Sequence, residues 1–243
     1  MIDREADGCA PRPEAEVVDE LAPVAAFSDA ERAALYRAIR ERRDVRNEFL
    51  DRDLPTPVLM RILEAAHLAP SVGLMQPWNF IVVRDATTRE AVYQAFGEAV
   101  ADEERALPAA QRPLYRSLKL QGIVKAPVNI CVTCDRDRRG ETGLGRTQQP
   151  DTDLLSTACA IQNLWLAARV EGVGVGWVSI LRDADLRRIL DIPDRIAIVA
   201  YLCVGFVEQS FVRPELEVRR WATRLPLSDL IFADRWGQPA DKS

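Results

Sequence analysis

Histidine is nearly absent from this sequence of 243 residues, which contains one histidine, His67, and five cysteines. A zinc site needs about four ligands and a catalytic triad usually needs an imidazole, so the sequence argues against both kinds of centre. Cys131 and Cys134 have C-x-x-C spacing, but no second pair follows and they end an apolar, strand-like run. We therefore expect no metal, and we interpret the cysteines as buried, reduced thiols and His67 as an ordinary helix residue.

Long apolar runs and an excess of positive charge are also missing. No run approaches the roughly 18 apolar residues that a membrane-spanning helix requires. The formal net charge of −5 argues against general binding of a nucleic-acid backbone, although a local basic cluster could hold one phosphate. The first residues have neither the positive start nor the apolar core of a secretory signal. We expect a cytoplasmic protein with no membrane or nucleic-acid partner.

Apolar periodicity and capping residues predict about six helices and four or five strands. Ser28 opens a capping box, Pro57 stands at the first position of a second helix, and Thr87 is the expected cap of a third. A helix at 152–170 is apolar on almost every face, which is typical of a protein interior or a subunit interface. Strands are expected at 80–83, 127–133, 173–180 and 196–204.

Because helices alternate with strands, we expect an α+β fold with a mixed central sheet flanked by helices. Residues 1–26 contain prolines among acidic residues and are expected to form a flexible N-terminal arm. Residues 27–243 are expected to form a single domain. Its charged, aromatic tail from Glu208 is too long to be a loop that closes on itself.

Four arginines within seven residues, 40–46, follow the first expected helix. Guanidinium groups bind phosphate through paired, charge-assisted hydrogen bonds. Arg42 and Arg46 are spaced to converge on a ligand if the segment bends, and Asp44 between them should be held ionised. A solvated charge run that ends the helix is the alternative interpretation, and the pattern alone favours it.

Two other segments combine polar and aromatic residues. In 69–80, APSVGLMQPWNF, Ser71 and Gln76 beside apolar neighbours would suit a heteroaromatic ring, but the segment could equally be a structural connection. The run 172–179, GVGVGWVS, follows a helix and precedes a strand, which is the reverse of a Rossmann dinucleotide motif. Its glycines allow either close backbone packing or the approach of a flat ligand, with Ser179 presented at the strand.

Together, in this order, these segments resemble the nitroreductase superfamily, and within it the family of 5,6-dimethylbenzimidazole synthases. The resemblance spans most of residues 27–232 and is specific as an ordered set of motifs. Leu74, Gln148 and Leu155 depart from the expected pattern. The matching segments are 42–46, 69–73, 75–78, 115–120, 131–136, 144–147, 162–169 and 174–180.

The resemblance implies a homodimer that binds FMN at its interface, with an extended C-terminal segment wrapped around the partner. It also implies a catalytic role for Asp44, where related reductases usually carry serine, together with Ser179. The residues that would bind the flavin are Arg42, Arg43, Asp44, Val45, Arg46, Ser71, Leu118, Leu120, Ser179 and Arg224.

The implied activity is that of an oxidoreductase for which reduced FMN is a substrate. O₂ would be used to fragment the flavin into 5,6-dimethylbenzimidazole, the lower ligand of cobalamin, and erythrose 4-phosphate. A separate flavin reductase would supply the reduced FMN. The alternatives are an NAD(P)H-dependent FMN nitroreductase or cob(II)yrinic acid a,c-diamide reductase, and a non-catalytic FMN-binding protein.

Overall fold

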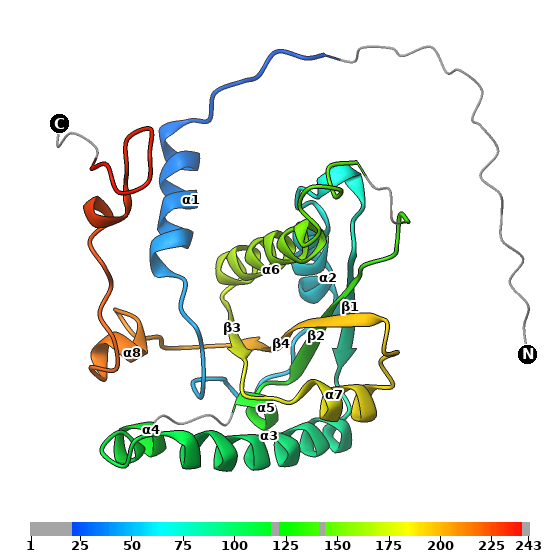
Figure 1. Cartoon of the computed structure of the whole chain (residues 1–243), viewed down its shortest axis with the longest axis vertical. Helices are drawn as coiled ribbons and strands as arrows, with labels where there is room; N and C mark the ends of the chain where they lie inside the picture. Colours follow the sequence, from blue (N-terminus) through cyan, green and yellow to red (C-terminus); the bar gives the residue numbers. More distant parts are fainter. Residues whose placement is uncertain (1–20, 118–121, 141–143, 240–243) are drawn as a thin grey trace, which may run out of the picture.

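A four-stranded antiparallel sheet forms the centre of the computed structural model, which describes residues 21–117, 122–140 and 144–239 (Figure 1). The strands are β1 (Trp78–Val83), β2 (Val128–Asp135), β3 (Val173–Val178) and β4 (Ile196–Phe206). Their order is β1-β2-β4-β3, and each neighbouring pair is antiparallel. The α+β class is confirmed, but the expected mixed sheet is corrected. Parallel pairing in the described chain is confined to a bridge between Asp44 and Val175.

Helices cover both faces of this sheet (Figure 1). The helices of its two covering layers are α2 (Thr56–His67), α3 (Ala86–Ala106), α5 (Gly122–Lys125), α6 (Thr152–Val170) and α7 (Asp183–Leu190). One core lies between the sheet and α2 with α6, and a second lies between the sheet and α3, α5 and α7. Strand β2 serves both cores, because Ile130 and Val132 belong to the first and Cys131 to the second.

Capping residues fix where the first and third long helices begin. The predicted capping box of α1 (Asp29–Glu41) is present, with the Glu31 N–H donating to Ser28 Oγ and the Ser28 N–H donating to the Glu31 carboxylate. In α3 the cap is Asp85 and not Thr87, since the Asp85 carboxylate accepts the Thr88 N–H at 2.7 Å. The Asp85 carboxylate accepts a hydrogen bond from the first turn as well as the Thr87 hydroxyl would, so the helix begins two residues earlier than predicted.

Residues beyond the sheet extend away from the body of the molecule (Figure 1). After β4 the tail contains α8 (Glu215–Val218) and η2 (Leu227–Leu230). At the other end, residues 21–28 are exposed and form neither helix nor strand, while residues 1–20 of the predicted arm lie outside the described ranges. No helix of the described residues has the length and apolar character needed to cross a membrane.

Candidate active site

The arginine-rich segment that follows α1 lies against β3. The Val45 N–H donates to the Val175 carbonyl at 3.0 Å, and Asp44 forms the parallel bridge with Val175. The two chains are so close that a Cβ atom on Gly176 would lie 1.9 Å from the Val45 carbonyl oxygen. Of the two interpretations of the glycine run, close backbone packing is therefore present, and it fixes Asp44 beside β3.

Two donors hold the Asp44 carboxylate. Oδ1 accepts the Trp177 N–H at 2.9 Å, and Oδ2 accepts Arg46 Nε at 3.1 Å. Burial raises the pKa of the Asp44 carboxyl above its ordinary value, and this effect outweighs the lowering by the Trp177 N–H, Arg46 and Arg42. That Asp44 is ionised stays a prediction, because burial and the donors shift the pKa of its carboxyl in opposite directions and burial has the larger effect. A carboxylate with a raised pKa is a stronger base than an exposed aspartate.

Asp44 and Ser179 line one cavity of about 300 Å³. Ser179 follows the last residue of β3, so the same strand that holds Asp44 also presents the serine hydroxyl. Flat apolar walls with a few polar groups suit a heteroaromatic ring, and we call this space the aromatic cavity. Its other lining residues include Phe96, Glu103, Tyr115, Trp177, Ile180, Cys203, Leu216 and Trp221.

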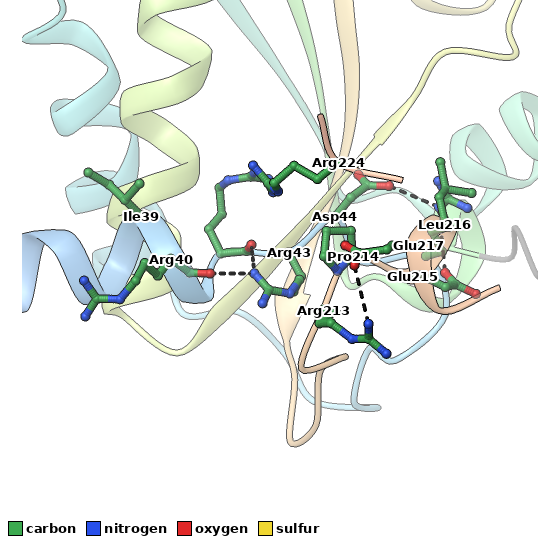
Figure 2. Close-up of a pocket in the computed structure, with 12 residues that line it drawn as sticks. Ile39, Arg40, Arg43, Asp44, Arg213, Pro214, Glu215, Leu216, Glu217 and Arg224 are labelled. Atoms are coloured by element: carbon green, nitrogen blue, oxygen red, sulfur yellow. Dashed lines mark hydrogen bonds and ion pairs between the residues drawn. The ribbon is translucent and has the colours of Figure 1, made fainter. Parts of the chain in front are cut away.

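A second cavity, of about 550 Å³, adjoins the first and is strongly basic; we call it the cationic cavity (Figure 2). Asp44, Arg46 and Leu216 line both spaces, so they stand at the junction. In Figure 2 the Arg40 side chain extends away from Asp44, although this residue borders the cavity. The charged residues of the lining are Arg40, Arg42, Arg43, Asp44, Arg46, Arg213, Glu215, Glu217 and Arg224.

The arginines of this cavity differ in which other groups of the protein their side chains already contact. The Arg42 guanidinium lies over the Trp165 ring, 4.7 Å from its centroid, and burial is the main cause that lowers its pKa. Arg43 donates instead to the carbonyls of Phe211, Arg40 and Arg42 at 2.7–2.9 Å. Arg43 therefore fastens the tail to the segment after α1, and its contact with a flavin stays a prediction.

One other predicted flavin contact, Ser71, lies apart from both cavities. Ser71 lies before the short 3-10 helix η1 (Val72–Leu74), where its Oγ accepts the Gln76 N–H at 3.1 Å. It lines neither the aromatic nor the cationic cavity. Leu118 and Leu120 lie outside the described residues. The structure thus brings together Arg42, Arg43, Asp44, Val45, Arg46, Ser179 and Arg224 around two joined cavities.

Several lining residues escaped the sequence reasoning. Tyr115, from α4 (Arg112–Ser117), donates its hydroxyl to Glu103 Oε2 at 2.9 Å and so closes the aromatic cavity against the end of α3. Burial and the neighbouring Glu103 raise the pKa of Tyr115, which keeps the phenol protonated. Trp221 reaches the same cavity from the tail. Tyr115 lies in the matching segment 115–120, but the sequence assigned it no role in the site, and long-range packing places both residues at the cavity.

The residues set aside as ordinary have ordinary surroundings. His67 Nδ1 accepts the Trp78 Nε1–H at 3.2 Å. Cys131 and Cys134 are buried free thiols of β2, and burial raises the pKa of Cys131 to about 12. Among the described residues, no three His, Cys, Asp or Glu side chains gather as a metal ion would need.

The fold and these cavities agree with the result of comparing the sequence with known families. A sequence model of the Nitroreductase family matches residues 39–206, which is more than half of the chain. The chain belongs to the nitroreductase family. The match ends with β4, so the tail residues that line both cavities lie beyond it.

Curated relatives specify the branch of the family. The chain is 38% identical over 200 residues to 5,6-dimethylbenzimidazole synthase of Rhodospirillum rubrum, covering 82% of this chain and 94% of that protein. It is 39% identical over 200 residues to the synthase of Rhodobacter capsulatus, covering 82% and 96% of the two chains. The resemblance seen in the motifs is thereby confirmed.

Solved structures share the fold at lower sequence identity. An iodotyrosine deiodinase bound to FMN and 3-iodo-L-tyrosine superposes with a TM-score of 0.62 at 19% identity, covering 73% of this chain and 91% of that chain. A nitroreductase from Desulfovibrio desulfuricans in complex with FMN gives a TM-score of 0.59 at 23% identity, covering 83% and 97%. These likenesses show that the chain shares their fold.

Proposed function

We propose that this protein is a 5,6-dimethylbenzimidazole synthase, an oxidoreductase that fragments reduced FMN with O₂. The synthases of R. rubrum and R. capsulatus support this assignment through their similarity along most of the chain. The observation that carries it is the position of Asp44, a carboxylate with a raised pKa at the junction of a cationic and an aromatic cavity.

The donor set of the two cavities fits FMN. Arg42, Arg46 and Arg224 would hold the phosphate in the cationic cavity, since guanidinium groups pair well with phosphate oxygens. The ring would lie in the aromatic cavity beside Trp177, and the ribityl chain would cross the junction near Asp44. When bound in its reduced form, FMN supplies both the electrons for O₂ and the carbon atoms of the product.

The residues of this chain then have separate tasks. The arginines bind and orient the phosphate, and the aromatic walls exclude water from the ring. Asp44 is placed to take up a proton at its carboxylate, and Ser179 offers a hydroxyl on the same wall. The Trp177 N–H and Arg46 keep the carboxylate oriented toward the junction.

The assignment is tested by incubating the protein with chemically reduced FMN, once in air and once without oxygen. Flavin and 5,6-dimethylbenzimidazole are then quantified by chromatography. We expect the benzimidazole to form in air with matching loss of flavin, and neither change to occur without oxygen. NAD(P)H alone with oxidised FMN should give at most slow product, because a separate flavin reductase is the expected source of reduced FMN.

Other outcomes of this incubation identify the alternative functions. Full recovery of FMN in air with rapid oxidation of NAD(P)H would assign a nitroreductase or a corrin reductase. Recovery of FMN with no oxidation of NAD(P)H would assign a binding protein without catalysis.

Replacing Arg42 or Arg46 by alanine should weaken FMN binding about tenfold or more. Each arginine is expected to make a charge-assisted contact with the phosphate, which contributes about 1.5–3 kcal/mol. Riboflavin has no phosphate, so its affinity should fall much less. Fluorescence titration with both ligands measures the difference.

The matched control is Arg37→Ala, which removes an exposed arginine of α1 that pairs with Glu41 and lines neither cavity. It should leave both affinities unchanged. Equal losses for FMN and riboflavin in the Arg42 and Arg46 variants would refute a phosphate role.

We further infer that the functional form is a homodimer. Helix α6 is buried along much of its length, yet α1 and the tail leave an apolar surface uncovered, which two copies could bury against each other. The predicted contact of Ser71 with flavin also requires a second copy, because Ser71 lines neither cavity of this chain. The large exposed apolar residues of these two elements are Leu35, Tyr36, Ile39, Val212, Val218, Trp221, Leu225, Leu227, Leu230, Ile231 and Trp236.

Sedimentation velocity at micromolar concentration should therefore give the mass of a dimer. Replacing Tyr36 and Ile39 by serine should shift the protein toward monomer, since it removes apolar area from the expected interface. A stable, folded wild-type monomer at that concentration would contradict the dimer.

A further inference from the structure

Arg46 lies between two carboxylates, one from each end of the chain. Its Nε donates to Asp44 Oδ2 at 3.1 Å and lies 3.9 Å from Glu215 Oε2. The side chains of Arg46 and Glu215 are only 17% and 5% exposed. An acidic group is therefore buried in the wall of a cavity whose other charges are mostly positive.

A second arginine holds the far side of this glutamate. Arg219 Nε donates to Glu215 Oε1 at 2.7 Å, and Arg219 lines neither cavity. Glu215 is the first residue of α8 and lies in the tail, beyond the part of the chain that matches the family. Arg46 and Arg219 thus share one carboxylate, and only Arg46 faces the ligand cavities.

A phosphate in the cationic cavity would meet Arg46 already paired with acids. Buried charges are stable only when they are paired, so a ligand phosphate gains less from an arginine that has a carboxylate partner than from one that has none. The glutamate would also repel the phosphate directly. Glu215 should therefore weaken the hold on phosphorylated ligands and leave ligands without phosphate unaffected.

We propose that Glu215 is a specificity-determining residue that competes with the ligand phosphate for Arg46 and limits the affinity of the site for phosphorylated ligands. This inference rests on the proposed function, because it takes the ligand of the cationic cavity to be the phosphate of FMN. In that reaction both the substrate and the sugar-phosphate fragment carry this group. A weakened hold on the phosphate would favour release of the fragment.

The test compares wild type, Glu215→Gln and Arg219→Gln by titration with FMN and with riboflavin. Glu215→Gln removes the competing charge and keeps the size of the side chain, so FMN should bind at least about threefold more tightly. Arg219→Gln should have the opposite effect, because Glu215 loses its other partner and pairs more strongly with Arg46. Riboflavin affinity should stay within about twofold in both variants.

The double variant Glu215→Gln/Arg219→Gln should bind FMN as Glu215→Gln does, since Arg219 acts through the glutamate. Asp229→Asn serves as the charge control, because Asp229 is an exposed tail residue that lines neither cavity, and it should leave FMN binding unchanged. Circular dichroism and thermal unfolding establish that each variant is folded. If Glu215→Gln does not fold, Arg219→Gln alone tests the proposal. It should weaken the binding of FMN more than the binding of riboflavin.

Unchanged FMN affinity in Glu215→Gln, or equal losses for FMN and riboflavin, would overturn the proposal and leave Glu215 as an anchor of the tail. Failure of the proposed function has a different signature. In that case the wild-type protein itself would bind FMN no better than riboflavin, or would bind FMN without consuming it in air.

Discussion

Replacing Asp44 by asparagine should lower the rate of 5,6-dimethylbenzimidazole formation at least about 100-fold, which is the usual contribution of a positioned general base. Asparagine keeps the size of the side chain and its oxygen can still accept the Trp177 N–H. It cannot take up a proton at physiological pH. FMN binding should be at least as tight as in wild type, because the arginines and the aromatic walls remain and Arg46 loses one of its two acidic partners. Single-turnover assays with reduced FMN in air measure the rate.

The control is Asp51→Asn, which changes an exposed aspartate that lines neither cavity and should leave the rate unchanged. In wild type the rate should fall as the pH drops through the pKa of Asp44, which burial places above the ordinary aspartate value. A variant at position 44 that forms product at a near-normal rate would remove Asp44 from the chemistry.

Gly176→Ala should both destabilise the protein and disable the site. The added Cβ would lie 1.9 Å from the Val45 carbonyl oxygen, and a backbone atom held by β3 cannot move aside as a side chain can. Overpacking of this kind costs about 1–3 kcal/mol, and we expect the upper end of that range in urea unfolding. Product formation should fall strongly, because the displaced segment carries Asp44 and Arg46.

Two glycine variants provide matched comparisons for this effect. A Cβ on Gly174 would contact side-chain methyl groups of Val207 and Val45 at 2.6 and 2.8 Å, which can shift, so Gly174→Ala should be milder. Gly97 lies in α3 with no atom within 4 Å of an added Cβ, and Gly97→Ala should stabilise the helix by about 0.5–1 kcal/mol. Equal effects at positions 174 and 176 would show that the backbone contact does not govern the site.

Local sequence signals predicted those parts of the site that lie close together in the chain. The arginine cluster around Asp44 was a candidate phosphate site because guanidinium groups pair with phosphate, but its pattern alone favoured a solvated charge run, and the family resemblance assigned it to FMN. The glycine run indicated a close approach to β3, but its pattern could not say that the partner would be Val45. Tertiary packing decides which residue lies against a glycine. The sequence of the strand itself contains no pattern that identifies this residue.

Residues contributed from a distance could not be predicted in the same way. Glu215 and Trp221 stand in segments without a recognisable motif, and the motif that contains Tyr115 gave it no role in the site. The roles of all three depend on how α4 and the tail pack. The antiparallel sheet was missed for a related reason. Strand periodicity reports which face of a strand is buried, but not which strand is its neighbour, and β2 pairs with β4, which follows only after α6, β3 and α7.

The cationic cavity is built from residues near both ends of the chain. Its two walls are therefore synthesised at different times. Asp44 and Arg46 leave the ribosome early, and all four strands are complete at Phe206. The cationic cavity still lacks the wall that contains Glu215 and Arg224 at that moment. A nascent chain can therefore assemble its sheet before it can close around a phosphate. If the cationic cavity binds the flavin phosphate as proposed, we expect flavin binding to be one of the last properties that the growing polypeptide acquires.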